Sequence, residues 1–251
     1  MLPYDELGSG DAVVLLHAGV ADRRMWSEHL EPLADAGYRV VAMDLPGFGE
    51  AVPGVGSAKP WDDVLATMDG LEIESATLVG NSFGGAVALR VAALATPRVR
   101  SMVLVSIPVP GVEPSTELQA AWDAEEAALE RADVEGAVDA VLDAWLIDDA
   151  PPALRQRVAV MQRRALQLQR DAADEEADED EDPVGEDLGA VSGLGMPSLV
   201  IAGARDFTDF VQGSELLAGA LPGRAWWSSR TPVISRQSKP RRGLERCCGT
   251  F

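Results

Sequence analysis

A serine between glycines is the first feature of the chain whose residue types could do chemistry. The segment Gly80-Asn81-Ser82-Phe83-Gly84 has the spacing G-x-S-x-G, with the apolar run 76–79 before it and a helix-forming stretch after it. Glycines allow a sharp turn between a strand and a helix, and a serine there projects its hydroxyl above the sheet, beside the N–H groups of the helix start. We predict that Ser82 is a nucleophile rather than part of a plain small-residue turn. A phosphate-binding loop is disfavoured because no lysine follows the glycines.

A second turn could complete the site. The segment His17-Ala18-Gly19-Val20 follows the apolar run 12–16. Such a turn can supply one backbone N–H of an oxyanion hole, from Gly19 or Val20, facing the N–H of Phe83. The later segment 44–49, Asp-Leu-Pro-Gly-Phe-Gly, is interpreted as loop geometry without a chemical role.

Short β-rich runs alternate with helical stretches and must position these turns. The expected strands are Ala12–Leu16, Tyr38–Met43, Ala76–Val79, Ser101–Ile107 and Ser198–Ala202, with a further strand near Tyr4. The expected helices cover residues 25–36, 60–70 and 84–95. Near-continuous apolar strands are typical of parallel sheets covered on both faces, so the expected fold class is α/β with a doubly wound, mostly parallel sheet.

Residues 113–171 interrupt this alternation. They are rich in Ala, Leu, Glu, Gln and Arg, with apolar residues at helical spacing, and they predict two or three helices and no strand. Eleven acidic residues lie between Asp171 and Asp187, and we interpret this segment as a solvated loop. A calcium-binding EF-hand is disfavoured because Pro183 stands where its turn needs glycine, and Gly189 where it needs a bidentate glutamate.

Three segments, LLHAGVADRRMW, VVAMDLPGFGE and LVGNSFGGAVAL, resemble the α/β-hydrolase fold family. The likeness is greatest to bacterial esterases, lactonases and perhydrolase-like members with a short helical cap, and it covers residues 4–223. It implies a triad in the chain order serine, acid, histidine. It also implies Asp206, in the segment SLVIAGARD, as the acid, with Asp209 as a weaker substitute.

The resemblance implies a division of the chain as well. The expected parts are a core in two pieces, 1–112 and 183–223, a helical cap with the acidic loop over 113–182, and an aberrant basic tail over 224–251. The cap helices would roof an acyl pocket. We expect this pocket to be lined by Val20, Trp26, Trp122 and Trp145.

A serine at this turn restricts the type of reaction that we expect. A serine nucleophile suits acyl transfer through an acyl-enzyme, whereas related dehalogenases and epoxide hydrolases use an aspartate at this turn. We therefore expect a serine hydrolase acting on a small carboxylic ester or lactone, with no metal or organic cofactor. Perhydrolysis and C–C bond hydrolysis of a diketone use the same triad and stay open. The rival class is a non-catalytic protein that binds a small ligand.

The histidine of the triad is missing from its expected place after the last strand. The chain has two histidines, His17 and His29. His17 lies in the oxyanion turn and is expected to shape it, and His29 is expected at the surface of the following helix. Because a serine hydroxyl is a weak nucleophile without a base, we expect the chain as written to be a weak or inactive esterase.

Residues 224–251 do not match the rest of the chain. They hold seven basic residues against one acidic residue, and both cysteines, Cys247 and Cys248. Our hypothesis is a reading-frame shift near Gly223, and the alternative is a natural divergent tail. Codons read one base out force valine at position 227 and leucine at position 248, and permit Pro-Asp-Ala-Gly-His-Leu-Pro over 230–236, with histidine in place of Ile234. The last strand and helix are then expected to be disrupted in the present chain.

Length, composition and charge restrict the class of protein, its partners and its location. A chain of 251 residues with 47% apolar residues suits one α/β domain with a sizeable core. Its net charge of −20 argues against nucleic acid or an anionic membrane as the main partner. No apolar stretch reaches membrane-spanning length and the start has no signal-peptide pattern, so the expected location is the cytoplasm. Few cysteines and histidines make a disulfide framework or zinc site unexpected, and the oligomeric state stays open.

Overall fold

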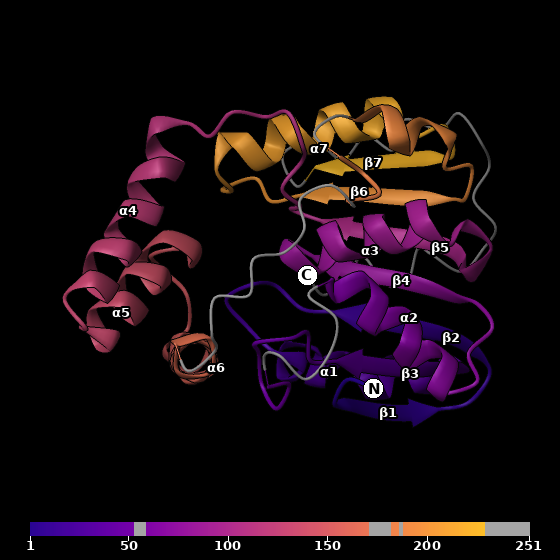
Figure 1. Ribbon diagram of the computed structural model, residues 1–251, viewed down its shortest axis with the longest axis horizontal. Helices are drawn as coiled ribbons and strands as arrows, with labels where there is room; N and C mark the ends of the chain where they lie inside the picture. Colours follow the sequence, from indigo (N-terminus) through magenta and orange to yellow (C-terminus); the bar gives the residue numbers. More distant parts are fainter. Residues whose placement is uncertain (53–58, 171–181, 186–187, 229–251) are drawn as a thin grey trace.

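A single twisted sheet organises the chain (Figure 1). The computed structural model describes residues 1–52, 59–170, 182–185 and 188–228. The described residues form a seven-stranded sheet in the order β1-β3-β2-β4-β5-β6-β7, in which β1 is antiparallel to β3 and all other neighbours are parallel. The strands are β1 (Tyr4–Gly8), β2 (Asp11–Leu16), β3 (Tyr38–Met43), β4 (Ala76–Asn81), β5 (Val99–Val105), β6 (Ser198–Ala202) and β7 (Arg224–Ser228).

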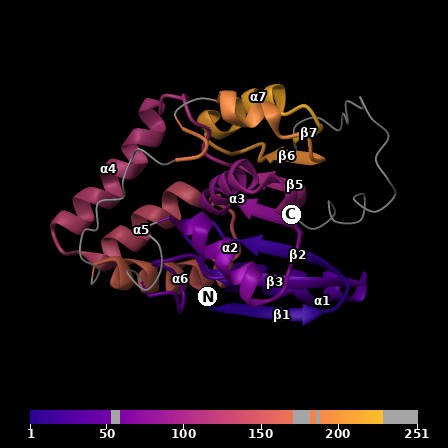
Figure 2. The same ribbon diagram turned by 45° about the vertical axis from the view of Figure 1, so that its right-hand side comes forward.

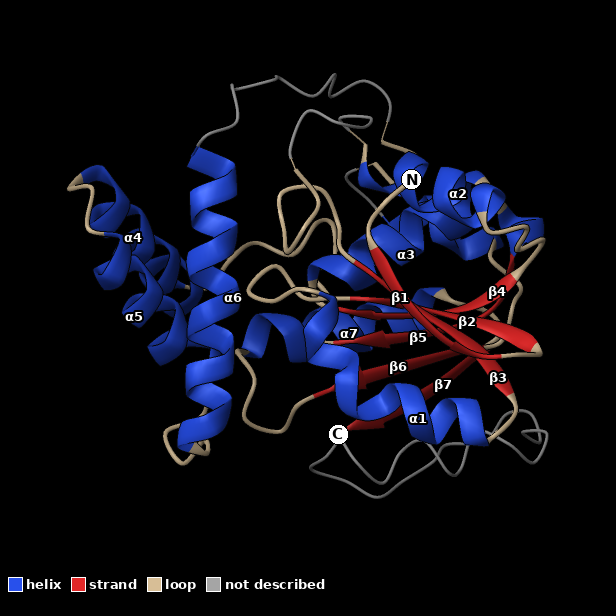
Figure 3. Cartoon of the chain, turned by 90° about the horizontal axis from the view of Figure 1, so that it is seen from below, coloured by secondary structure: helices blue, strands red, loops and turns tan. Residues whose placement is uncertain are grey.

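Helices cover both faces of the sheet (Figure 3). Because successive side chains of a strand point to opposite faces, Val14 and Leu16 of β2 join one apolar cluster and Val13 and Leu15 join another. The first face packs against α2 (Pro60–Gly70), α3 (Phe83–Leu94), α7 (Thr208–Ala220) and the 3-10 turn η4 (Leu188–Gly193). The second face packs against η1 (Arg23–Trp26) and α1 (Ser27–Asp35).

Three further helices lie beyond the carboxyl ends of the parallel strands (Figures 1 and 2). They are α4 (Thr116–Glu130), α5 (Val134–Trp145) and α6 (Pro152–Arg170). Side-chain caps start the first two, since Ser115 accepts the N–H of Leu118 and Asp133 accepts that of Gly136. The three helices bury a cluster of their own, which also includes Ala21 after the oxyanion turn.

Helix α6 joins this group to the rest of the molecule. It carries five arginines and no acidic residue in a chain of net charge −20. Its ion pairs reach α5 through Arg155–Asp143 and Arg163–Glu135, and α1 through Arg157–Glu28. Ion pairs thus link α6 both to its neighbouring helix and to the helix on the second face of the sheet.

The fold class and the element order predicted from the sequence are confirmed. All five expected strands and the strand near Tyr4 are present, and residues 113–171 hold three helices. The strand predicted over Ser101–Ile107 is shifted, because β5 begins at Val99 and ends at Val105. In the described part of the chain, no helix is both long and apolar enough to span a bilayer.

The expected disruption of the last strand is wrong. Strand β7 pairs in parallel with β6 over five consecutive residues, from Arg224 to Ser228. Backbone pairing places little demand on side-chain identity at a sheet edge, so an unusual composition can still form the ladder. The expected disruption of the last helix, most of the acidic loop and Ile234 lie outside the described residues.

Candidate active site

The turn between β4 and α3 holds Ser82 in an unusual conformation. Its φ of 48° and ψ of −116° lie outside the regions that non-glycine residues normally occupy. The surrounding hydrogen bonds fix this geometry: the N–H of Ser82 donates to the carbonyl of Val105 at 2.8 Å, and the N–H of Gly85 donates to the carbonyl of Ser82 at 2.9 Å. Strain of this kind persists only where the surroundings determine it, and it concentrates at functional sites.

The glycines around Ser82 are required by close backbone contacts. A Cβ atom at Gly84 would lie 2.4 Å from the carbonyl oxygen of Leu16, and one at Gly80 would lie 2.5 Å from the carbonyl oxygen of Gly84. Either distance is far below van der Waals contact. The G-x-S-x-G spacing therefore reflects the tight packing of the turn against β2 as well as the sharp change of direction.

The oxyanion turn lies directly against the serine turn. The N–H of Gly84 donates to the carbonyl of His17 at 3.0 Å, and a Cβ atom at Gly19 would lie 3.5 Å from the Cβ of Phe83. The N–H groups of Gly19 and Phe83 donate no hydrogen bond to another described residue. The structure thus brings together the two residues expected to donate to an oxyanion, at the positive end of α3.

Asp206 lies in the turn after β6, two strands from Ser82. Its carboxylate accepts the N–H of Phe207 at 3.0 Å and a hydrogen bond from the Ser106 hydroxyl. Burial raises the pKa of Asp206, and these hydrogen bonds offset only part of that effect. Ser106 follows Val105, the residue that accepts the N–H of Ser82. The carboxyl ends of β4, β5 and β6 therefore place Ser82, Ser106 and Asp206 in one row.

Ser106 was not expected from the sequence. The strand predicted over 101–107 included it, although Pro108 and Pro110 are signals that the strand ends earlier. Like Ser82, it has a positive φ, of 47°. This conformation turns the chain away after β5 and lets the Ser106 hydroxyl meet Asp206.

Asp209, the weaker acid candidate, is engaged elsewhere. Its carboxylate accepts the N–H of Ser115 at 2.5 Å and the Ser115 hydroxyl at 2.7 Å. Ser115 is the residue that caps α4. Asp209 thus links the start of α7 to the start of α4, and Asp206 is the candidate acid that lies at the strand ends.

Neither histidine is placed as a base for Ser82. His17 is completely buried, its Nε2 accepts the N–H of Leu45 at 2.9 Å, and its Nδ1 lies 2.8 Å from the carbonyl of Ala18. Because Nε2 accepts a hydrogen bond, the ring proton must be on Nδ1, and both nitrogens are occupied. Burial lowers the pKa of His17, which keeps it neutral. His29 stacks edge-on against Trp26 on the second face of the sheet, 5.6 Å between centroids.

The turn 44–49 makes hydrogen bonds and ring contacts with residues 17–23, in and after the oxyanion turn. Asp44 is completely buried: its Oδ1 accepts the N–H of Arg23 and its Oδ2 accepts the N–H of Glu50, each at 2.8 Å. The Arg23 guanidinium pairs with Oδ2 as well. Phe48 of this turn packs between His17 and Phe83, with ring centroids 5.0 and 5.8 Å away. These contacts support the interpretation of the segment as loop geometry.

The residues expected to line an acyl pocket are scattered. Trp26 is 1% exposed and packs with Val13 and Leu15, so it is a core residue under α1 rather than a pocket residue. Trp122 is 42% exposed on α4. Trp145 packs edge-on against Phe207 and Phe210, and Val20 packs into the cluster of α4–α6. A tryptophan pattern alone does not tell which face of an element buries the side chain.

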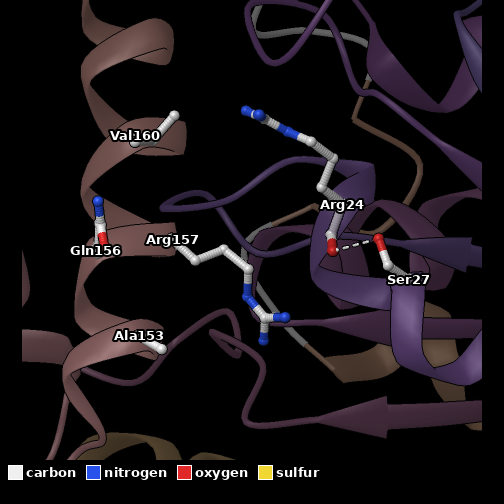
Figure 4. Close-up of a pocket in the computed structure, with 6 residues that line it drawn as sticks. All are labelled: Arg24, Ser27, Ala153, Gln156, Arg157 and Val160. Atoms are coloured by element: carbon white, nitrogen blue, oxygen red, sulfur yellow. Dashed lines mark hydrogen bonds between the residues drawn. The ribbon is translucent and has the colours of Figure 1, made fainter.

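Two cavities lie among the described residues, and one of them is next to the serine turn. One, of about 740 Å³, begins at Phe83 and extends along α3 to Arg90. The other, of about 470 Å³, lies between α6 and η1–α1 (Figure 4) and is lined by Arg24, Ser27, Ala153, Gln156, Arg157 and Val160. Its two guanidinium groups point in different directions and bind Asp22 and Glu28. None of the residues expected in the site lines it, whereas the first cavity is lined by Phe83, the residue that follows Ser82.

The strand order, the sharp turn at Ser82 and the acidic residue after β6 are features of the α/β-hydrolase fold. The family model for the alpha/beta hydrolase fold matches residues 11–230, and the chain belongs to this family. Over 115 residues it is 39% identical to a 2-hydroxy-6-oxo-6-phenylhexa-2,4-dienoate hydrolase of Comamonas testosteroni. That match covers 42% of this chain and 39% of the relative, so less than two thirds of the relative's length is spanned.

Solved structures share the fold at low identity. An enol-lactonase of Burkholderia xenovorans superposes with a TM-score of 0.72 and 21% identity, covering 90% of this chain and 87% of the other. A thermophilic esterase of Thermogutta terrifontis superposes with a TM-score of 0.69 and 22% identity, covering 90% and 84%. These similarities establish the architecture and say nothing of which substrate this chain takes.

Proposed function

We propose that the chain is a serine hydrolase of small carboxylic esters or lactones, with Ser82 as nucleophile and Asp206 as acid. The observation that carries the proposal is the strained Ser82 at the start of α3, with the N–H groups of Gly19 and Phe83 left without partners among the described residues beside it. A tetrahedral oxyanion needs such preorganised donors, and removing one from a hydrolase typically costs about 10²–10³ in kcat.

The proposed reaction has two steps. The Ser82 oxygen attacks the carbonyl carbon, the N–H groups of Gly19 and Phe83 stabilise the oxyanion, and the C–O bond to the leaving alcohol breaks to give an acyl-enzyme. Water then attacks the acyl carbon, releases the acid and restores the serine hydroxyl. In perhydrolysis, hydrogen peroxide takes the place of that water. In the hydrolysis of a diketone, a C–C bond breaks in place of the C–O bond. The turn at Ser82 suits all three reactions.

The proton of Ser82 has no base to receive it among the described side chains. His17 is tied at both nitrogens and His29 lies on the second face of the sheet, and the sequence has no further histidine. The proton must therefore go to water. Loss of a triad member typically leaves only the residual, roughly 10³–10⁴-fold, acceleration of the oxyanion hole and binding. We propose that this chain is impaired accordingly.

The same observation favours a second function, a non-catalytic protein that binds a small ligand in the cavity at Phe83. Under both proposals, α4–α6 act as a cap over the strand ends. The cap covers residues 113–182, the core covers 1–112 and 183–223, and the basic tail begins at residue 224. The support for the cap is the shared cluster in which Ala21, next to the oxyanion turn, packs against Val138 and Met161.

Covalent labelling tests the choice. A fluorophosphonate forms a bond between phosphorus and the serine oxygen, with loss of fluoride and of the serine proton. We expect slow labelling of Ser82, located by peptide mass spectrometry and absent in Ser82→Ala, together with weak turnover of p-nitrophenyl acetate. An unlabelled wild-type chain would favour the ligand-binding protein. Rapid turnover that Ser82→Ala abolishes would contradict the proposed impairment.

A further inference from the structure

The cavity at Phe83 has a built polar end. It runs along α3 from Phe83 to Arg90, which lies seven residues and therefore about 10 Å further along the helix axis. Ala86 and Val87 of α3 lie between these ends, and Val109 after β5 and Trp61 of α2 also line the cavity. A ligand whose carbonyl lies at the oxyanion donors would thus extend through apolar surroundings before it meets a charge.

The charge at the far end is already neutralised. The Arg90 guanidinium donates to Asp182 through Nε at 3.0 Å and through Nη2 at 2.5 Å, and its third nitrogen donates to the carbonyl of Ala86 at 3.2 Å. The guanidinium also lies over the Trp61 ring, 5.5 Å from its centroid. Every nitrogen of Arg90 therefore has a partner within the protein.

Asp182 keeps its charge in this arrangement. It accepts the N–H of Val184 at 2.9 Å in addition to the hydrogen bonds from Arg90. Burial acts to raise the pKa of Asp182, but the hydrogen bonds outweigh it and the pKa lies below its usual range. Glu113, which is exposed, also lines the cavity, so the described lining residues hold two carboxylates and one guanidinium.

We propose that this cavity binds the non-reacting part of the substrate and selects uncharged apolar or aromatic groups against groups that carry a carboxylate. The inference rests on the proposed function and deepens it by naming the substrate class. A ligand carboxylate at the far end would have to displace Asp182 from Arg90 or lie beside it as a like charge, and it would share the cavity with Glu113. An aryl or alkyl chain can lie against the apolar side chains of Phe83, Val87 and Trp61.

A matched pair of non-hydrolysable ligands tests the selection. The probes are a fluorinated aryl alkyl methyl ketone and the same ketone with a terminal carboxylate, titrated by fluorine NMR on wild type, Asp182→Asn and Arg90→Met. We expect wild type to bind the neutral ketone at least about tenfold more tightly, since a lost charged hydrogen bond costs about that much. Asp182→Asn keeps an oxygen for Val184 but frees the guanidinium, and it should tighten the carboxylated ketone about tenfold and leave the neutral one unchanged.

Two controls make the outcome decisive. Asp69→Asn breaks a comparable pair with Arg98, 2.7 Å long and away from the cavity, and should leave the ratio of the two affinities unchanged. Ser82→Ala removes the same contact from both ketones and should leave the ratio of the two affinities unchanged. Equal binding of the two ketones by wild type, an unchanged ratio in Asp182→Asn, or no binding of either ketone would overturn the inference. Selective binding without fluorophosphonate labelling would instead overturn the hydrolase proposal alone.

Discussion

Ser82 combines the proposed reactive position with a backbone conformation that costs free energy. A non-glycine residue in a sparsely populated region costs about 1–3 kcal/mol. We therefore expect Ser82→Gly to be more stable than Ser82→Ala and to unfold at a higher temperature. The expected difference in the free energy of unfolding is about 1 kcal/mol, after allowance for the flexibility of glycine in the unfolded chain. Both variants lose the hydroxyl, so the comparison isolates the backbone. Equal melting temperatures, measured by calorimetry, would show that the φ of 48° carries no strain.

Asp206 gives the fold a pH dependence of defined sign. Burial raises its pKa, so the folded state binds the proton more tightly than the unfolded state does. Its contribution is fully favourable below about pH 4, the ordinary range of an aspartate, and is lost as the pH rises through the raised value. We expect Asp206→Asn to be more stable than wild type at pH 7, and to show a smaller fall in stability between about pH 4 and pH 7. Urea unfolding at a series of pH values measures both. A wild-type slope that Asp206→Asn leaves unchanged would contradict the prediction.

Residues whose roles depend on local sequence could be predicted, and those that depend on distant contacts could not. The turn at Ser82 follows from glycines within four residues of it. Arg90 and Asp182 are 92 residues apart, and no local pattern pairs them. The position of Asp209 after β6 suits an acid, but its hydrogen-bond partner, Ser115, comes from a segment 94 residues earlier, which no local pattern reveals.

At the scale of elements, the start of α7 is tied to the start of α4. Asp209→Ala removes both bonds to Ser115, and we expect it to cost about 2 kcal/mol, or about 4–8 °C in the unfolding midpoint. Asp209→Asn, which keeps an acceptor, should lose less.

The matched control lies close by. Asp149 pairs with Arg205, the neighbour of Asp206, but 72% of its side chain is exposed. Asp149→Asn should therefore change the stability by less than about 0.5 kcal/mol, as is usual for exposed ion pairs. Equal effects of Asp209→Ala and Asp149→Asn would mean that the tie does not hold the two helices together.

Elements with strong periodicity could be predicted with nearly their observed bounds. The apolar run 38–43 and the proline-started helix 60–70 coincide with β3 and α2. The strand β7 could not be judged in the same way, because its side chains resemble no buried strand and its formation depends on the edge that β6 offers. Arrangement beyond the single element needs long-range contacts that the sequence pattern does not specify.

At the scale of the molecule, the two faces of the sheet are unequally covered. On the face of α2, α3 and α7, Leu78, Leu104 and Val200 are completely buried. On the opposite face their sequence neighbours Val79 and Leu199 are only half-buried. Among the described helices it is α1 that packs on that face, over β2 and β3. The side over β4–β6 therefore offers apolar surface that a further helix could bury.

The half-buried face of the sheet and the absence of a catalytic histidine lead to one prediction about residues 224–251. We expect a chain that carries the one-base-shifted reading of this segment, with histidine at position 234, to melt at a higher temperature, because an apolar helix would then bury the half-exposed side chains at about 25 cal/mol per Å². We also expect its kcat/KM for p-nitrophenyl acetate to rise by at least about 10³-fold, because the serine proton gains an acceptor. The control is the same segment with isoleucine kept at position 234, which should retain the gain in melting temperature and lose the gain in turnover. If the shifted segment changes neither the melting temperature nor kcat/KM, the present residues 224–251 are a natural tail. Sequencing codons 220–235 tests the same point directly, because the hypothesis fails if the alternative frame has no histidine codon at position 234.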